Sequence, residues 1–411
     1  MAPFPLSLTQ LLGHWGAYVV YLLIGFAFGY VLEISGFAIS TKLAAQFYFK
    51  EMTVLKVMFT GIIVAMVLIF AATGLGLLDY NLIWVNPTYL WPGIVGGLIM
   101  GVGFIIGGFC PGTSLVSAAT LKIDGIFFAL GGLFGIFLFG ETVQYFEEFW
   151  NSSYYGRLTL MDWLNLPTGV VVVGVVLMAL IMFWGGEQLE QMIGGKDKPQ
   201  HRWGRRAAAA TILAGAVLVL IIGQPTTQDK WTRLAPEKEA LLAARTVQIH
   251  PGELLANLAD DQVKVVMLDV RDEADYNLFH IRRARHLPLD QVQAAIPELQ
   301  LEAAANTVFV VMSNDETAAT AAWKLLVAES VPNVYILEGG LNNWLTVFGH
   351  DDPTLQQTPT PSGDDRLHYI FAAALGDRYA AADPDAHHYE LEYTPKIKLQ
   401  MKRGASGGGC G

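Results

Sequence analysis

Six long apolar stretches in the first half of the chain are the strongest signal in the sequence. They cover residues 16–39, 54–78, 89–109, 124–146, 167–186 and 207–224. A helix needs roughly 20 mostly apolar residues to cross the hydrocarbon core of a bilayer. The pattern therefore predicts six spans within residues 1–225, with the lipid bilayer as their partner.

The pattern changes in the second half of the chain. A polar linker, residues 226–244, leads to short apolar runs at 263–268, 307–312 and 333–337, with a helical pattern at 318–329. Buried strands that alternate with helices are typical of a parallel sheet. We expect a multi-pass α-helical membrane protein with a C-terminal α/β domain, residues 245–350. A tail, residues 351–411, follows, with an exposed strand expected at 391–402 and a Gly-rich arm that ends in Cys410.

The charges follow the same division. The chain is 53% hydrophobic and 15% charged, whereas soluble proteins carry about a quarter charged residues. The net charge of −11 divides into −1 for residues 1–225 and −10 for residues 226–411. This acidic balance argues against nucleic acid as a partner, because phosphate binding needs a basic surface. Neither CxxC nor HExxH spacing occurs, so we expect no metal and no cofactor.

Basic residues in the short loops indicate the orientation of the spans. Lys and Arg gather in the loops after the first, third and fifth apolar stretches, and the other loops hold few. Cytoplasmic loops are the ones that carry excess positive charge. We therefore expect both termini, and with them the α/β domain, on the outer side of the membrane.

The membrane half contains an internal repeat. Four residues recur with a constant offset, Gly25, Gly29, Gly36 and Phe37 as Gly97, Gly101, Gly108 and Phe109. The match places Ala38 opposite Cys110. Duplicated spans with broken helices are how many transporters build a central pathway, although small residues also serve ordinary helix packing.

The segment around Cys110 carries the most chemistry in this half. Gly107, Gly108 and Pro111 interrupt an apolar run, and Pro111 suits the first turn of a new helix, Gly112–Leu121, with Cys110 near its N-cap. The N–H groups and dipole at such an end stabilise a thiolate and attract an anion. Thr113 and Ser114 add hydroxyl donors. The alternative is that Cys110 is a small buried apolar residue.

The string GGFCPGTS, together with GFAFGYVLEISGF, resembles the YeeE/YedE sulfur-transport family. The resemblance implies uptake of thiosulfate or a related small sulfur anion across a bacterial inner membrane, past cysteines of the pathway. Only Cys110 corresponds to such a cysteine, because Ala38 stands at the repeat-related position. The unit is short for a complete pore, which favours a homodimer. Glu33, late in the first span, is a second candidate residue, because intramembrane carboxylates are usually functional or paired.

The strings VVMLDVRDEADYNLFHIRRARHLPL and NVYILEGGLNNW resemble the rhodanese domain. Rhodaneses carry sulfur on a cysteine at the end of the central strand, and here Met312 stands at that position with Ser313 next to it. Neither side chain can form a persulfide, and the acids Asp315 and Glu316 in the same loop would repel thiosulfate. We therefore expect no sulfurtransferase activity of the rhodanese type and a role in sulfur capture, docking or regulation.

These observations lead to one leading hypothesis and two alternatives. In the first, a sulfur anion enters through a pathway lined by Glu33, Gly108 and the segment Cys110, Pro111, Gly112, Thr113 and Ser114, assisted by a periplasmic rhodanese-like module. In the second, the protein is a membrane-anchored sulfur relay that carries persulfide on Cys410. In the third, it is a scaffold that recruits a sulfur-carrier or sulfur-oxidising protein.

Overall fold

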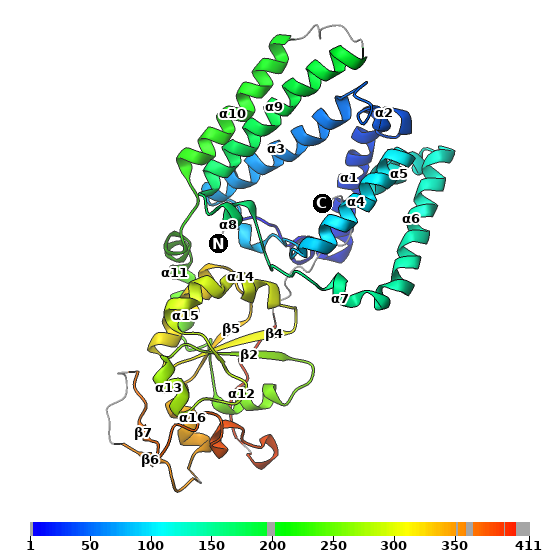
Figure 1. Cartoon of the computed structure of the whole chain (residues 1–411). Coiled ribbons are helices and arrows are strands. Elements are labelled where there is room, and N and C mark those ends of the chain that lie inside the picture. The colour runs from blue at the N-terminus through cyan, green and yellow to red at the C-terminus, as the bar shows by residue number, and fades with distance from the viewer. Residues whose placement is uncertain (1–2, 195–201, 351, 359–364, 390, 400–411) are drawn as a thin grey trace. The chain divides into compact units, whose positions relative to one another are not determined.

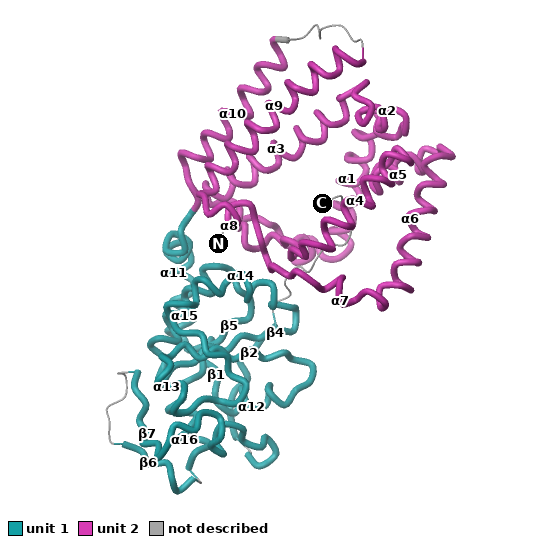
Figure 2. Tube along the Cα trace, in the orientation of Figure 1, with its two compact units in different colours: residues 1, 225–405 teal, residues 2–224, 406–411 magenta. Residues whose placement is uncertain are grey.

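The computed structural model describes residues 3–194, 202–350, 352–358, 365–389 and 391–399. The chain divides after Gln224 into a helical unit and an α/β unit, which are coloured separately in Figure 2. The prediction for Cys410 lies outside the described residues.

The helical unit contains long apolar helices joined by short ones (Figure 1). Its elements are α1 (Leu8–Ile34), α2 (Ser40–Ala44), α3 (Thr53–Gly74), η1 (Tyr80–Leu82), α4 (Leu90–Gly107), α5 (Pro111–Ala119), α6 (Ile123–Thr142), η2 (Val143–Tyr145), α7 (Glu147–Trp150), α8 (Leu160–Leu164), α9 (Thr168–Gly194) and α10 (Arg202–Ile222). Within the described residues, six helical segments are long and apolar enough to span a membrane, with α4 and α5 together forming the third. The prediction of six spans is confirmed.

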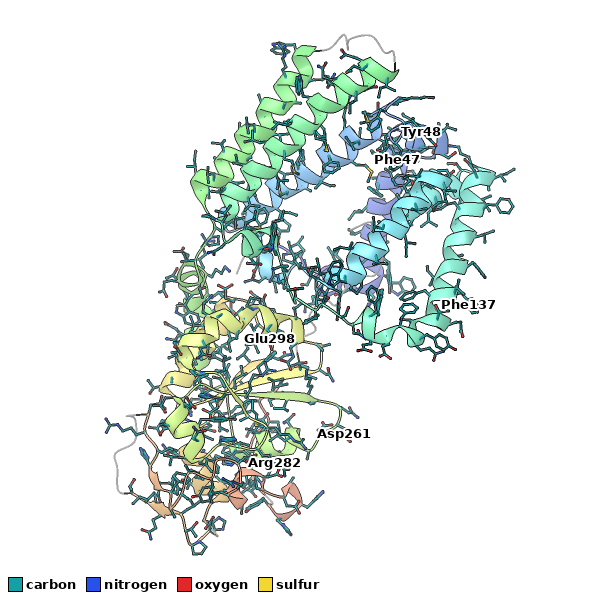
Figure 3. The ribbon with its side chains drawn as sticks, in the orientation of Figure 1. Phe47, Tyr48, Phe137, Asp261, Arg282 and Glu298 are labelled. Carbon is teal, nitrogen blue, oxygen red and sulfur yellow. The ribbon has the colours of Figure 1, made fainter. Side chains whose placement is uncertain are left out.

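Two parts of the helical unit differ in how they are packed. Helices α3, α9 and α10 lie side by side and share a core that includes Ile63, Val67, Val172 and Val176 (Figure 1). Helices α1, α4 and α6, in contrast, leave most of their apolar side chains exposed, as Phe137 of α6 shows in Figure 3. Such surfaces suit lipid or a further apolar partner, because the bilayer solvates them without cost.

Both copies of the repeat identified in the sequence contain a glycine with a left-handed backbone directly after a long helix. Helix α1 ends before Gly36 and helix α4 ends before Gly108, and both glycines have left-handed backbone angles, with φ of 77° and 70°. Only glycine adopts this conformation without steric cost. At the first break, Gly36 N donates to Glu33 O and Phe37 N donates to Leu32 O, which is the pattern that closes many helix ends.

The two breaks lie against each other. A Cβ atom at Gly108 would lie 2.8 Å from the carbonyl oxygen of Ser40, at the start of α2. Phe37 and Phe109, the residues that follow the two glycines, are both buried in one apolar cluster with Leu43 and Val54. The repeat therefore brings two helix breaks, far apart in the sequence, into direct contact.

The α/β unit is a five-stranded parallel sheet covered by helices, followed by a C-terminal extension. Its elements are α11 (Thr227–Ala243), β1 (Gln248–Ile249), α12 (Pro251–Leu258), β2 (Lys264–Asp269), α13 (Glu273–Leu278), β3 (Arg285–His286), η3 (Leu289–Gln291), α14 (Val292–Glu302), β4 (Thr307–Met312), α15 (Thr317–Ala328), β5 (Val334–Leu337), α16 (Gly340–Phe348), β6 (Gln356–Gln357), β7 (Tyr369–Ile370), η4 (Ala380–Ala382) and η5 (Ala386–His388). The predicted α/β fold is confirmed.

The strand order β1-β5-β4-β2-β3 places β4 at the centre of the sheet. Every residue of β4 is buried, as is typical of a parallel strand covered on both faces. Its side chains alternate between two apolar clusters: Val308 and Val310 face α12 and α16, and Phe309 and Val311 face α14 and α15. The carboxyl end of β4, which leads into α15, is where ligands bind in folds of this kind.

Two segments of the α/β unit differ from the expectation. The predicted linker contains helix α11, which packs against α15 through Trp231 and Trp323, with ring centroids 6.2 Å apart. The tail is part of the folded unit: Ala381 O accepts a hydrogen bond from Trp344 Nε1 at 2.8 Å. Residues 391–399 form no strand, and the N–H groups of Lys396 and Ile397 donate instead to the buried carboxylate of Glu253. Both segments are polar in composition, so the sequence pattern gave no indication of these contacts.

A buried ion pair joins the sheet to the loops at its carboxyl edge. Arg271 and Asp269 expose only 2% and 0% of their side chains and form two hydrogen bonds, of 2.8 and 2.6 Å. The same guanidinium donates to Phe279 O and to Asn314 Oδ1. All these groups have lost water, so the fold depends on their mutual contacts.

We expect Arg271→Met to destabilise the α/β unit by about 3–5 kcal/mol, because it leaves the buried Asp269 carboxylate without its counter-charge. The matched control is Arg282→Met, which breaks the pair with Asp383, whose side chains are 56% and 63% exposed; Arg282 is labelled in Figure 3. The control should cost about 0–1 kcal/mol. Hydrogen exchange of the β2 and β4 amides in the full chain measures both values, and equal effects would contradict the assigned role of Arg271.

We expect Gly108→Ala to destabilise the helical unit, because a left-handed backbone costs an alanine about 1–2 kcal/mol and its Cβ would collide with Ser40 O. Gly101→Ala on the same helix is the matched control, since a Cβ there meets nothing within 4 Å. The midpoint of heat-induced aggregation of detergent extracts, followed by size-exclusion chromatography, should fall only for Gly108→Ala. A fall of the same size at Gly101 would show that the break contact is unimportant.

Candidate functional site

Cys110 is the N-cap residue of α5. Its Sγ accepts a hydrogen bond from Thr113 N at 3.5 Å, and its own N–H donates to Thr113 Oγ1 at 3.0 Å. This reciprocal pair satisfies backbone donors at the start of the helix. Pro111 occupies the first helical position, where a missing N–H has no cost. The thiol, half-buried, is therefore fixed at the positive end of α5, directly after the break at Gly108.

Polar side chains continue along one face of α5. Thr113, Ser114 and Ser117 follow Cys110 at the spacing of a helix face, and all three are buried. The hydroxyls that the sequence offered as donors have local acceptors: Ser114 Oγ donates to Pro111 O at 2.8 Å and Thr113 Oγ1 to Cys110 O at 3.2 Å. In the described part of the helical unit, Ser117 Oγ is buried without a hydrogen-bond partner. The sequence reading missed Ser117, although its spacing of seven from Cys110 was the available signal.

Glu33 lies at the far end of α5 rather than at its cysteine end. Lys122, in the turn between α5 and α6, approaches Glu33 Oε1 at 3.4 Å. In the adjoining turn, Ser40 Oγ donates to Asp124 Oδ2 at 2.7 Å. These pairs link the end of α1 and the start of α2 to the α5–α6 turn. The negative charge of Glu33 is therefore paired with the positive charge of Lys122, as expected for a carboxylate near the end of a membrane span.

The loop between β4 and α15 contains the residues that the sequence placed at the sulfur position. Met312 ends β4, and its side chain packs in the core with Val308 and Val310. Ser313 is fully buried, and its Oγ accepts a hydrogen bond from Ala319 N at 3.2 Å. Of the two residues, Ser313 is the one that presents its side chain to the start of α15. A hydroxyl there cannot store sulfur.

The acids of this loop have partners within the unit. Glu316 binds Arg245 at 2.6 Å and accepts from Gly339 N at 2.7 Å, and Asp315 Oδ1 accepts from Asn342 Nδ2 at 2.8 Å. The hydrogen bond to Glu316 holds the pKa of the Arg245 guanidinium above its ordinary value. Glu316 therefore has a counter-charge in Arg245, which also pairs with Glu338, whereas Asp315 is bound by a neutral amide. Arg245, from outside the loop, was not visible in the sequence pattern.

Comparisons with known proteins match both units. The sulphur transport family matches residues 34–248, slightly more than half of the chain, and the rhodanese-like domain matches residues 250–346. The thiosulfate sulfurtransferase GlpE of Pseudomonas fluorescens is 34% identical over 83 residues, which is 20% of this chain and 72% of that enzyme. A crystal structure of a protein from Lactobacillus plantarum is 23% identical and covers 28% of this chain and 93% of its own, with a TM-score of only 0.23.

The two family matches agree with the resemblances drawn from the Cys110 segment and from the rhodanese-like strings. The match to the sulphur transport family covers the second to the sixth span. In the part of the chain that the structure describes, no group of three His, Cys, Asp or Glu side chains is arranged to hold a metal ion. The chain is therefore a member of the sulphur transport family, a multi-pass membrane protein that carries a rhodanese-like domain after its spans.

Proposed function

We propose that this protein takes up a small sulfur anion, such as thiosulfate, through its helical unit, and that Cys110 contacts the substrate. The observation that carries the proposal is the position of Cys110 Sγ at the N-terminus of α5, in a helix break that contacts the matching break of the repeat. Broken helices at membrane depth place helix ends at the binding sites of many transporters. Their positive ends favour an anionic substrate.

The chemistry of the contact follows from the thiol. The positive end of the α5 dipole attracts the negative charge of the anion, and the S–H group donates a hydrogen bond to a sulfur or oxygen atom of the anion. Thr113 holds the cysteine in place through four hydrogen bonds, so it acts as a positioning residue. Pro111 and Gly112 form the first turn, and Gly108 sets the direction of the break. Ser114 closes the same turn through its bond to Pro111 O.

The charges near the α5–α6 turn form the second part of the proposed path. Lys122 attracts an anion that has passed Cys110, and Glu33 limits the strength of that attraction through its ion pair. A pathway needs sites that bind weakly enough to release the ion. The basic loops support a cytoplasmic position for this turn, at the inner membrane, and a periplasmic position for the α/β unit.

The α/β unit docks or captures the sulfur source in this proposal. The related GlpE is named for sulfur transfer from thiosulfate, but here Ser313 occupies the loop and provides no sulfur-carrying atom. The helical unit acts as a homodimer, with the exposed apolar faces of α1, α4 and α6 available to the second copy. Sulfur-carrier or sulfur-oxidising proteins are the partners that the docking unit would receive.

Uptake of labelled thiosulfate into membrane vesicles tests the role of Cys110. We expect Cys110→Ala to reduce initial uptake by about tenfold or more, the factor that loss of one hydrogen bond to a charged group implies. Cys110→Ser keeps an N-cap oxygen and a hydrogen-bond donor, so it should retain more uptake than Cys110→Ala. Uptake by Cys110→Ala at the wild-type rate would overturn the proposal.

The matched control is Cys410→Ala, which removes the other cysteine of the chain. Uptake requires Cys110 and should persist in Cys410→Ala. A sulfur relay predicts the reverse, together with the mass of one added sulfur atom on the peptide that contains Cys410. Normal uptake in both variants would leave the scaffold as the remaining function.

A further inference from the structure

The start of α15 already holds a carboxylate, although from another part of the chain. Asp365, in the C-terminal extension, accepts from Asp315 N at 2.7 Å through Oδ1 and from Ala318 N at 2.8 Å through Oδ2. Both oxygen atoms are used: Asp315 belongs to the loop that follows the central strand, and Ala318 belongs to the first turn of α15. Bonds between backbone N–H groups and a charged acceptor are the stronger kind of protein hydrogen bond.

The extension is fixed in this position on both sides of the loop. Asn314 Nδ2 donates to Asp365 O at 2.8 Å, and Asn342 Nδ2 donates to Arg366 O at 2.7 Å. Asn342 Oδ1 also accepts from His368 N at 2.8 Å. Two asparagine side chains therefore bind the backbone of residues 365–368, and Asp365 itself adopts a left-handed conformation with φ of 53°.

The surroundings of the carboxylate favour an anion. Helix α15 is 12 residues long, and its N-terminal dipole stabilises negative charge within the first turn. Of the two acids of the loop, Glu316 is paired with Arg245, and Asp315 Oδ1 accepts from the neutral amide of Asn342. The two N–H groups that bind Asp365 are separate from these contacts. Ser313 is uncharged, and its Oγ accepts a hydrogen bond from a further backbone N–H in the first turn of α15, that of Ala319. The loop thus lacks an anion of its own at the position that Asp365 fills.

We propose that Asp365 is an internal ligand that closes this loop: its carboxylate occupies the position in which the start of α15 would otherwise hold a small oxyanion. The extension and a sulfur oxyanion such as sulfate or thiosulfate compete for the same two N–H groups. Because the extension belongs to the same chain, its effective concentration is high, and it excludes free anions from the wild-type loop. This contact is independent of transport through the helical unit.

Hydrogen exchange of the amides in residues 313–320, measured on the full chain in lipid nanodiscs, tests the proposal at the loop itself. We expect Asp365→Ala to speed exchange at Asp315 and Ala318 by about tenfold or more, the factor for losing a hydrogen bond to a charged group. Adding sodium sulfate or sodium thiosulfate should slow exchange again in this variant. Sodium chloride at equal ionic strength should leave it unchanged.

Asp383→Ala is the matched control, because Asp383 lies in the same extension and pairs with the exposed Arg282. Both this control and the wild-type chain should show no response to the oxyanions. Asp365→Asn is the second variant: it keeps the side-chain shape, removes the charge and should gain the anion response in a protein whose core amides exchange at the wild-type rate.

Three outcomes would overturn the proposal. These are unchanged exchange in Asp365→Ala, an anion response in the wild type equal to that in the variant, and the lack of any anion response in both Asp365 variants. Sulfate and thiosulfate are separate arms, so a response to thiosulfate alone would identify a site that recognises the outer sulfur atom. Because the readout is confined to residues 313–320, a failure here leaves the uptake experiment on Cys110 unaffected.

Discussion

Where a helix ends inside a membrane, its last backbone N–H and C=O groups need hydrogen-bond partners from the protein, because lipid chains provide none. Among the helix ends of the helical unit, those at Gly36 and Gly108 meet this requirement with a left-handed glycine. Each break is followed by a buried phenylalanine and a short helix, and the two breaks contact each other. The position of Cys110 depends on this arrangement, since the second break determines where α5 begins.

The two units use the same physical feature in different ways. At the start of α5 the N-cap is a sulfur atom, and at the start of α15 the first-turn N–H groups bind the carboxylate of Asp365. A helix N-terminus favours hydrogen-bond acceptors and negative charge at this position. In the helical unit the acceptor is the half-buried Sγ of Cys110, which belongs to the helix start itself. In the α/β unit the acceptor is a carboxylate from a distant part of the chain.

The sequence was sufficient for features that depend on local pattern. Span number followed from the length and hydropathy of six segments, and the start of α5 followed from Pro111 and the residues beside it. Contacts between distant segments were not accessible. Three contacts join residues that no spacing rule in the sequence relates. They are the close approach of Gly108 to Ser40 O, the ion pair of Glu33 with Lys122, and the binding of Asp365 to the loop before α15. Thr113 and Ser114 were recognised as polar, but their local hydrogen bonds depend on the exact backbone of the first turn.

The central claim is that Cys110 faces a water-accessible path, and its reactivity in folded protein tests that claim most directly. The measurement is the rate at which a membrane-impermeant thiol reagent modifies Cys110 in membranes, in a Cys410→Ser background. The account predicts modification of the native protein, slowed by thiosulfate and unaffected by chloride at equal ionic strength. A thiol that reacts only after the protein is unfolded would contradict it.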